Sequence, residues 1–226
     1  MRFIGASRRA LSSAAEIVRS EAEYVGVDPA GPMAPFARAA AFYAMRWAHF
    51  NISVARYGYL SHVRQRPPRR LQLRDAIRLR AGLCQSISEM MVSILSALDV
   101  PARTVSMYWS TEHGEDRNHV GAEAYWLSAW HFFDPTWEVY FAAPDDPFEV
   151  RSWEELMEGR PSVRRSNEAD PGLMRYLACP EDPFAYLRAP RVEFGAIGHL
   201  ATAQSRTQSR LRRCLGLSPA THQVSS

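Results

Sequence analysis

The sequence predicts an α+β protein, because helical patterns fill residues 8 to 98 and strand patterns follow over residues 103 to 134. With 226 residues, the chain is long enough to bury one sizeable core. Hydrophobic residues make up 46% of the chain and charged residues 23%, as in an ordinary globular protein. No apolar run approaches the roughly 18 residues that a membrane helix needs, so we expect no contact with a membrane.

The first part of the chain is predicted to be helical. Residues 8 to 24 have a helix-forming composition that ends at a stretch rich in glycine and proline. A second helical region runs from residue 33 to about residue 63, and we expect one face of it to be buried. That face carries Phe36, Ala40, Tyr43, Trp47, Phe50 and Val54. A third helix is predicted over residues 84 to 98, before Pro101 prevents its continuation.

Three strands are predicted after Pro101. Residues 103 to 109 are rich in β-branched and aromatic side chains. Residues 119 to 125 and 130 to 134 read as an antiparallel pair joined near Leu127 and Ser128. With the turn centred between residues 126 and 127, His119 would lie directly opposite Asp134, with Cβ atoms about 5 Å apart.

The pattern becomes looser after residue 141. Ser152 and Glu155 form a capping-box signal for a short helix, and several prolines interrupt the sequence that follows. We therefore expect a single domain of residues 1–226. Its parts are a core at about 45–141, a helical N-terminal extension over 1–44, a proline-rich portion over 142–200 and a flexible tail over 201–226.

The charged residues favour a protein partner over nucleic acid. The formal net charge is +3, and all 27 basic residues are arginine. A basic stretch precedes Cys84 and contains Arg64, Arg66, Arg69, Arg70, Arg74, Arg78 and Arg80. It is either a solvated surface or an electropositive rim that could receive an acidic carrier protein. No aromatic residues alternate with these arginines, so we expect no nucleic-acid partner.

The cysteines indicate neither disulfides nor a metal site. Cys84, Cys179 and Cys214 are far apart and odd in number, and none is part of a Cys-x-x-Cys motif. No loop has the alternating carboxylates of a calcium site. We expect no cofactor. Because charges interrupt the apolar residues at the N-terminus, no secretory signal is predicted, and the expected location is the cytoplasm.

Cys84 is the candidate nucleophile. It follows Gly82 at the start of a predicted helix, where unpaired backbone N–H groups lower the pKa of a thiol. The same N–H groups, including that of Cys84, could stabilise an oxyanion. A lone cysteine is more often a small buried hydrophobe. The order of Cys84, His119 and Asp134 along the chain instead favours a triad, in which the histidine exchanges the proton and the aspartate orients it.

The other histidines are weaker candidates. His131 lies three positions from Asp134, so on a strand it would point to the opposite face. His113 falls in a polar loop, where a solvated histidine is the simpler interpretation. His49, His62, His199 and His222 have no acidic or thiol context in the sequence.

Three short motifs together resemble the transglutaminase-like core of the papain-like thiol enzymes. They are Gly82-Leu83-Cys84, then Val100-Pro101-Ala102-Arg103, and Trp130-His131-Phe132-Phe133-Asp134-Pro135-Thr136, in an order that spans roughly residues 45–141. The resemblance implies a cysteine helix packed on an antiparallel sheet that carries the histidine and the aspartate. Members of the family often have a further oxyanion donor upstream, and by distance Trp47 and Asn51 are candidates.

The sequence also departs from the family pattern. Asp99 stands where the family commonly has glycine, and Gly121 stands where it commonly has an aromatic residue. The approach to Cys84 is also similar to that of the arylamine N-acetyltransferases, which have two glycines there. Ala81 in place of the first glycine favours the transglutaminase-like family.

The expected activity is cysteine-dependent acyl transfer through a thioester on Cys84. The substrate would be a peptide, an amide or an acyl thioester, and an acidic carrier protein could present the acyl thioester. An amine acceptor would make the enzyme an amide-forming transferase, whereas water would make it a peptidase or amidase. The further alternative is a non-catalytic binding module. The triad does not choose among these, because the acceptor depends on water exclusion and pocket shape.

Overall fold

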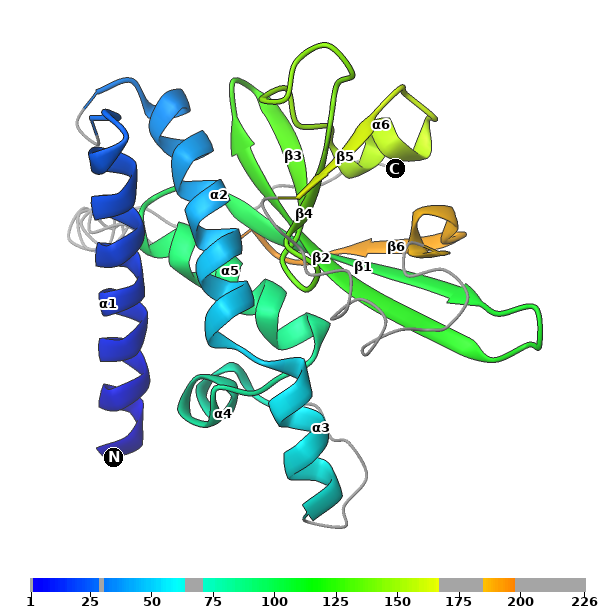
Figure 1. Ribbon diagram of the computed structural model, residues 1–226, viewed down its shortest axis with the longest axis horizontal. Coiled ribbons are helices and arrows are strands. Elements are labelled where there is room, and N and C mark those ends of the chain that lie inside the picture. Colours follow the sequence, from blue (N-terminus) through cyan, green and yellow to red (C-terminus); the bar gives the residue numbers. More distant parts are fainter. Residues whose placement is uncertain (1, 29–30, 64–70, 167–184, 198–226) are drawn as a thin grey trace, which may run out of the picture.

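The structure, a computed structural model, describes residues 2–28, 31–63, 71–166 and 185–197. Over these residues it is an α+β fold, with the helices of residues 2–97 on one side of an antiparallel sheet (Figure 1). The helices are α1 (Arg2–Tyr24), α2 (Met33–Asn51), α3 (Val54–Val63), α4 (Leu73–Leu79), α5 (Cys84–Ala97) and α6 (Trp153–Met157). A 3-10 helix, η1, covers Ala185–Arg188.

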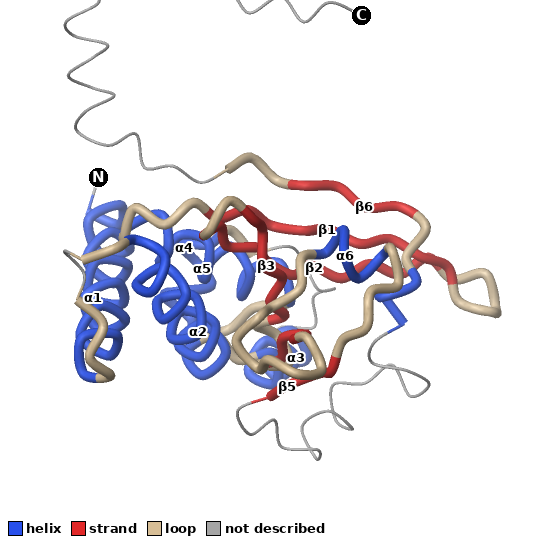
Figure 2. Tube along the Cα trace, turned by 90° about the horizontal axis from the view of Figure 1, so that it is seen from above, coloured by secondary structure: helices blue, strands red, loops and turns tan. Residues whose placement is uncertain are grey.

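The sheet has six strands in the order β5-β4-β3-β2-β1-β6, and every neighbouring pair is antiparallel. The strands are β1 (Ala102–Ser110), β2 (Asp116–Trp126), β3 (Ala129–Asp134), β4 (Val139–Ala142), β5 (Val163–Ser166) and β6 (Arg191–Phe194). Figure 2 shows β6 running beside β1, which extends the sheet with a segment close to the end of the described chain. The sheet therefore includes two strands from the portion expected to be proline-rich and irregular.

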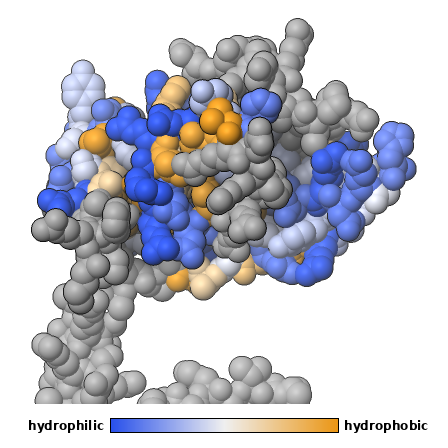
Figure 3. Space-filling view, turned by 90° about the horizontal axis from the view of Figure 1, so that it is seen from below, coloured by the Kyte–Doolittle hydropathy of each residue, from blue (hydrophilic) through white to orange (hydrophobic). Residues whose placement is uncertain are grey.

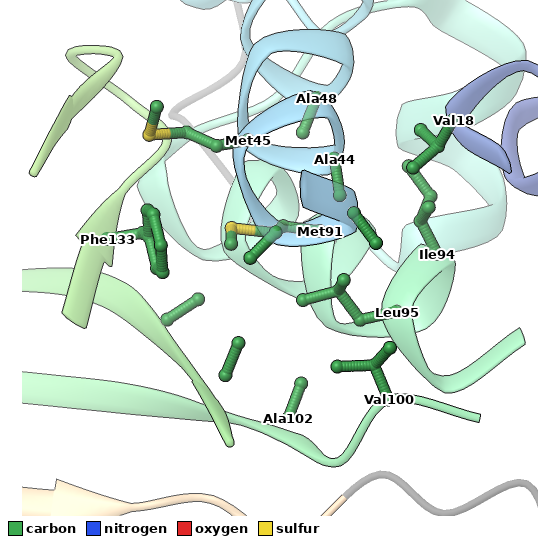
Figure 4. Close-up of a cluster of buried hydrophobic side chains, with 14 of the residues drawn as sticks. Val18, Ala44, Met45, Ala48, Met91, Ile94, Leu95, Val100, Ala102 and Phe133 are labelled. Carbon is green, nitrogen blue, oxygen red and sulfur yellow. The ribbon is translucent and has the colours of Figure 1, made fainter. Parts of the chain in front are cut away.

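Alanines rather than aromatics make up most of the buried face of α2. Its buried residues are Phe36, Ala37, Ala40, Ala41, Ala44, Met45 and Ala48. Short side chains let α2 pack closely against α1 and α5, whose Val18, Ile94 and Leu95 fill the space between the helices (Figure 4). The predicted buried face was therefore partly wrong. Tyr43 and Trp47 lie at its margin, and Phe50 is 64% exposed.

The helix predicted over residues 33 to 63 is interrupted at Ile52 and Ser53. Ile52 has extended backbone angles, and Ser53 forms a parallel bridge with Ala81. The Ser53 N–H donates to the Arg80 carbonyl, and the Gly82 N–H donates to the Ser53 carbonyl. These bonds require an extended backbone, which ends α2 and starts α3 in a new direction. The interruption thus anchors the segment that leads into Cys84.

The hairpin of β2 and β3 has a tighter turn than the predicted one. Trp126 pairs with Ala129, and Leu127 and Ser128 both have positive φ, as in a two-residue type I′ turn. The predicted register was wrong by two residues, because the turn is centred between residues 127 and 128. A shift of two keeps every side chain on its original face. His119 and Asp134 therefore remain on one face as diagonal neighbours instead of direct partners.

The two faces of the sheet carry separate clusters. Ala102, Ala122 and Ala124 face the helices. The opposite face carries what we call the second-face cluster: Val105, Met107, Phe132, Trp137, Val139, Phe141, Trp153, Tyr186 and Ala189. The predicted capping box at Ser152 is confirmed, and it begins α6, which brings Trp153 into this cluster.

The surface seen from the side of α3 is mainly hydrophilic, with smaller apolar areas (Figure 3). None of the helices in the described ranges combines the length and the apolar character needed to cross a membrane.

Candidate active site

The first turn of α5 presents Cys84 at the end of the sheet. The residue before it, Leu83, is the N-cap, and no side chain caps this helix. The first turn also contains no acidic residue. The N–H groups of the first turn therefore carry the partial positive charge of the helix dipole, and no carboxylate in that turn neutralises it. As a whole residue, Cys84 is partly exposed.

Gly82 is required by packing. A Cβ atom at this position would lie 2.6 Å from the Cβ of Ser86 and 3.0 Å from a methyl group of Ile52. The glycine thus lets the approach to Cys84 pass between α5 and the end of α2.

Val120 joins α5 to the sheet. The β2–β3 pairing ends at Ala122 and Phe133, so the polar groups of Val120 have no partner on β3. Two side chains of α5 contact these polar groups in place of β3. The Ser88 hydroxyl donates to the Val120 carbonyl at 2.8 Å, and the Val120 N–H donates to the Cys84 sulfur. The helix is thereby fixed one turn from Cys84, at the point where the strand pairing stops.

His119 lies between Cys84 and Asp134. Its Nε2 is 2.8 Å from Oδ2 of Asp134, and its ring also hydrogen-bonds Cys84. Since Nε2 is used by the carboxylate, Nδ1 is the nitrogen left for the thiol. His119 is 7% exposed and Asp134 is fully buried. The other oxygen of Asp134, Oδ1, accepts the Thr136 N–H at 3.0 Å, so the Asp-Pro-Thr turn holds the carboxylate in place.

The electrostatics of this group favour a thiolate–imidazolium pair. Burial alone would raise the pKa of Cys84, but its bond to His119, the charge of His119 and the Val120 N–H lower the pKa below its ordinary value. Burial would lower the pKa of His119, yet the Asp134 carboxylate and Cys84 raise that pKa to about 10. The proton thus belongs on the imidazole.

The structure therefore brings Cys84, His119 and Asp134 together, but it places Trp47 and Asn51 elsewhere. The Asn51 amide donates to the Trp47 carbonyl at 2.9 Å, within α2. Both residues line a hollow of about 410 Å³ between α1 and α2, whose lining includes no α5 residue. These contacts do not test the predicted role of Trp47 and Asn51 as oxyanion donors, which stays a prediction, as does that of the N–H groups of the first turn of α5.

His131 points away from the triad, as its parity on β3 predicts. Its Nδ1 donates to the Val150 carbonyl at 2.6 Å, and its ring stacks on Trp126. Burial lowers the pKa of His131, which favours its neutral form. It is a structural residue of the sheet.

Three contacts of the site were not predicted from the sequence. The Val120 N–H is a backbone group, and residue types carry no signal for it. His49, at the end of α2, hydrogen-bonds through Nδ1 to the carbonyls of Pro135 and Thr136, both at 3.2 Å, and so supports the turn after Asp134. Tyr186, from η1, stacks on the His119 ring. His49 and Tyr186 are each distant in sequence from the residue that they contact, so the local sequence pattern does not predict these contacts.

Comparison with known proteins shows the family of the chain. The profile of the transglutaminase-like superfamily matches residues 22–135, which is 114 of the 226 residues. The chain belongs to the transglutaminase-like superfamily. Members of this superfamily are generally cysteine-dependent acyltransferases or peptidases.

A solved structure described as "Crystal structure of a TGase" is similar to the chain at 17% identity, with a TM-score of 0.39. The match covers 59% of this chain and 32% of the TGase chain, so this protein corresponds to about a third of that structure. No curated protein matches the sequence.

This transglutaminase-like chain differs from the family pattern at Gly121, and the structure gives a reason. A Cβ there would lie 2.5 Å from the Phe132 ring, which occupies the space beside β2. Metal binding has no support in the described residues, where no three His, Cys, Asp or Glu side chains are grouped for an ion.

Proposed function

We propose that the protein is a cysteine-dependent acyl-transfer enzyme with Cys84 as nucleophile, His119 as proton donor and acceptor, and Asp134 as the residue that orients His119. The observation that carries this proposal is the continuous chain of contacts from the Cys84 sulfur to the imidazole of His119, whose Nε2 is 2.8 Å from the buried Asp134 carboxylate. Such a chain supplies both an activated thiolate and a proton for the leaving group.

In the first half-reaction the Cys84 thiolate attacks the carbonyl carbon of an amide or a thioester. A C–S bond forms, and N–H groups of the uncapped first turn of α5 stabilise the oxyanion. The His119 imidazolium gives its proton to the departing amine or thiol as the bond to that group breaks. The products are an acyl-Cys84 thioester and a neutral imidazole.

In the second half-reaction the acceptor is an amine or water. It gives a proton to the His119 imidazole and attacks the thioester carbonyl, after which the C–S bond breaks. The Cys84 thiolate and the imidazolium are restored. An amine acceptor would make the protein a transglutaminase-like acyltransferase, and water would make it a peptidase or amidase; the triad alone does not choose between the two.

Alkylation by iodoacetamide, followed by mass spectrometry of each cysteine peptide, tests whether Cys84 is activated. We expect Cys84 to react faster than Cys179 and Cys214 near neutral pH, and to retain this advantage at mildly acidic pH, because its pKa is lowered. His119→Asn should slow the reaction of Cys84 by roughly tenfold for each pH unit by which its pKa rises. Equal labelling of the three cysteines would favour a non-catalytic binding module and overturn the proposal.

Partition of the acyl intermediate identifies the acceptor class. The wild-type protein would be given an acyl thioester of a small thiol, with and without hydroxylamine, and Cys84→Ser would be the control. Hydroxamate formation faster than hydrolysis supports acyl transfer to an amine. Hydrolysis unchanged by hydroxylamine would instead identify a hydrolase.

A further inference from the structure

The imidazole of His119 is covered by a side chain that lies beyond the part of the chain matched by the family. The ring of Tyr186 stacks on it, with 4.6 Å between the ring centroids and 25° between the planes. Tyr186 is 1% exposed, and it belongs to η1, whereas the family profile ends at residue 135. One face of the proposed proton carrier is therefore supplied by a C-terminal element.

Tyr186 is held in place from two sides. Its ring approaches Trp153 of α6, with centroids 6.3 Å apart. After η1 the chain enters β6, which pairs with β1 from Tyr108 to Val105. Met107 of β1 belongs to the same cluster as Tyr186 and is the cross-strand partner of His119. The stack is thus fixed to the strand pair that carries the histidine.

This arrangement restrains the imidazole in a way that its hydrogen bonds alone do not. The bonds to Cys84 and Asp134 lie in the plane of the ring and define its direction. A stacked ring opposes tilting out of that plane, and its π face also attracts a cationic ring. Of the described groups, Cys84, Asp134 and Tyr186 are the titratable ones that contact His119.

We propose that Tyr186 is a positioning residue of the active site, which holds the His119 ring in the plane joining Cys84 to Asp134 and stabilises its protonated form. Residues 185–194 then complete the catalytic site in addition to extending the sheet. The inference rests on the proposed function, because a fixed imidazole matters only if His119 exchanges protons with substrate and Cys84.

The test compares two substitutions that differ in the aromatic ring. Tyr186→Phe retains the stack, whereas Tyr186→Leu keeps an apolar side chain without a π face. The measured quantity is the pH dependence of Cys84 alkylation by iodoacetamide, read by mass spectrometry. With Y186L we expect the acidic midpoint of this profile to move upward by roughly half to one pH unit, because a less stable imidazolium stabilises the thiolate less. Y186F should keep the wild-type midpoint.

Phe141→Leu is the matched control. It also removes a ring from the second-face cluster, but that ring stacks on Phe132 rather than on His119. It should lower the unfolding temperature without moving the midpoint. An equal shift of the midpoint in F141L and Y186L would attribute the effect to general loosening and overturn the role of Tyr186.

A measurement on the wild-type chain keeps the inference testable if Y186L does not fold. The Tyr186 ring current should displace the His119 ring-proton resonances upfield, and Y186F should preserve the displacement. Ordinary shifts in the wild-type protein would contradict the stack. If wild-type Cys84 has the pH profile of an ordinary thiol, the proposed function fails. If that profile is acid-shifted and Y186L retains it, only the role of Tyr186 fails.

Discussion

Each of the two carboxylate oxygens of Asp134 has its own hydrogen-bond partner. Oδ2 binds His119 and Oδ1 accepts the Thr136 N–H, so asparagine cannot satisfy both donors with its single oxygen. Asp134→Asn should lower kcat/KM by on the order of 10³-fold or more, as loss of the orienting carboxylate does in related triads. Steady-state kinetics with a small acyl thioester measure this. Asp75→Asn, in a partly exposed pair with Arg74 and Arg78, should have little effect.

The ion pair of Cys84 and His119 gives folding a defined pH dependence. Between the ordinary pKa values of histidine and thiol, 6.5 and 9.0, the unfolded chain holds one proton on the thiol. Wherever folded Cys84 is a thiolate, the folded pair also holds one proton, on His119, and the pair adds no pH dependence. Above pH 9.0 the unfolded thiol loses its proton while His119 keeps its own up to about 10, so stability falls as the pH rises.

The lowered pKa of Cys84 changes stability in the opposite direction to the raised pKa of His119, so below pH 9.0 the two effects offset each other. Urea unfolding of the wild type and of a C84A/H119A double variant, at a series of pH values, measures the difference. We expect the stability contributed by the pair to decline above pH 9.0. A difference that rises steadily from acid to alkali would exclude the ion pair.

Gly121 is fixed by the aromatic residue that packs across it. Gly121→Ala would press a Cβ against the Phe132 ring and lie 3.1 Å from the Phe133 carbonyl oxygen. We expect a loss of roughly 1–3 kcal/mol in the free energy of unfolding, measured in urea. Gly58→Ala is the control, because a Cβ there meets no atom within 4 Å and α3 gains a better helix former. A neutral G121A would contradict the tight contact.

At the scale of elements, the buried ion pair of Arg103 and Glu123 contacts residues of four strands, β1, β2, β3 and β6, and of α6. The Arg103 guanidinium on β1 binds Glu123 on β2 at 2.7 Å and lies between the rings of Trp130 and Phe194. The other oxygen of Glu123 accepts the Trp153 N–H. Burial raises the pKa of Glu123 in spite of these partners, so the desolvation of this carboxylate is costly.

Removal of one partner should therefore cost more than removal of both. We expect Arg103→Met to destabilise the fold by about 3–5 kcal/mol, because it leaves the Glu123 carboxylate buried without its cation. R103M/E123Q should recover part of that loss in urea unfolding. Arg117→Met is the control, since its pair with Glu115 is exposed and worth about 0–1 kcal/mol. Additive losses in the double variant would show that the two residues act independently.

The elements near the triad were predictable where local pattern defines them. Helix α5 follows from apolar spacing, and a β-strand period of two keeps His119 and Asp134 on one face despite the error of two residues in the turn. The break at Ser53 was not predictable, because it depends on a bridge to Ala81. Strand β6 and the Tyr186 stack likewise depend on partners distant in sequence, for which the local pattern has no signal.

At the scale of the whole molecule, exposed arginines lie on the segment that leads into Cys84. Arg74, Arg78 and Arg80 are exposed, and α4, which carries the first two, lies on the helical side of the molecule (Figure 1). Arg64, Arg66, Arg69 and Arg70 lie outside the described residues. We propose that this surface receives an acidic carrier protein bearing the acyl thioester, because opposite charges speed encounter and orient the two proteins.

Reversal of the three described arginines tests this partner. R74E/R78E/R80E lowers the formal net charge by six, from +3 to −3, and makes this surface acidic. The value of kcat/KM for a thioester on an acidic carrier protein should therefore fall by about tenfold or more at low salt. The same acyl group on a small thiol should react at the wild-type rate. R117E/R160E/R191E makes an equal change of charge on exposed arginines of β2, β6 and the end of α6. An equal loss in this control would assign the effect to net charge, and unchanged turnover of the carrier-linked substrate in R74E/R78E/R80E would exclude the docking surface.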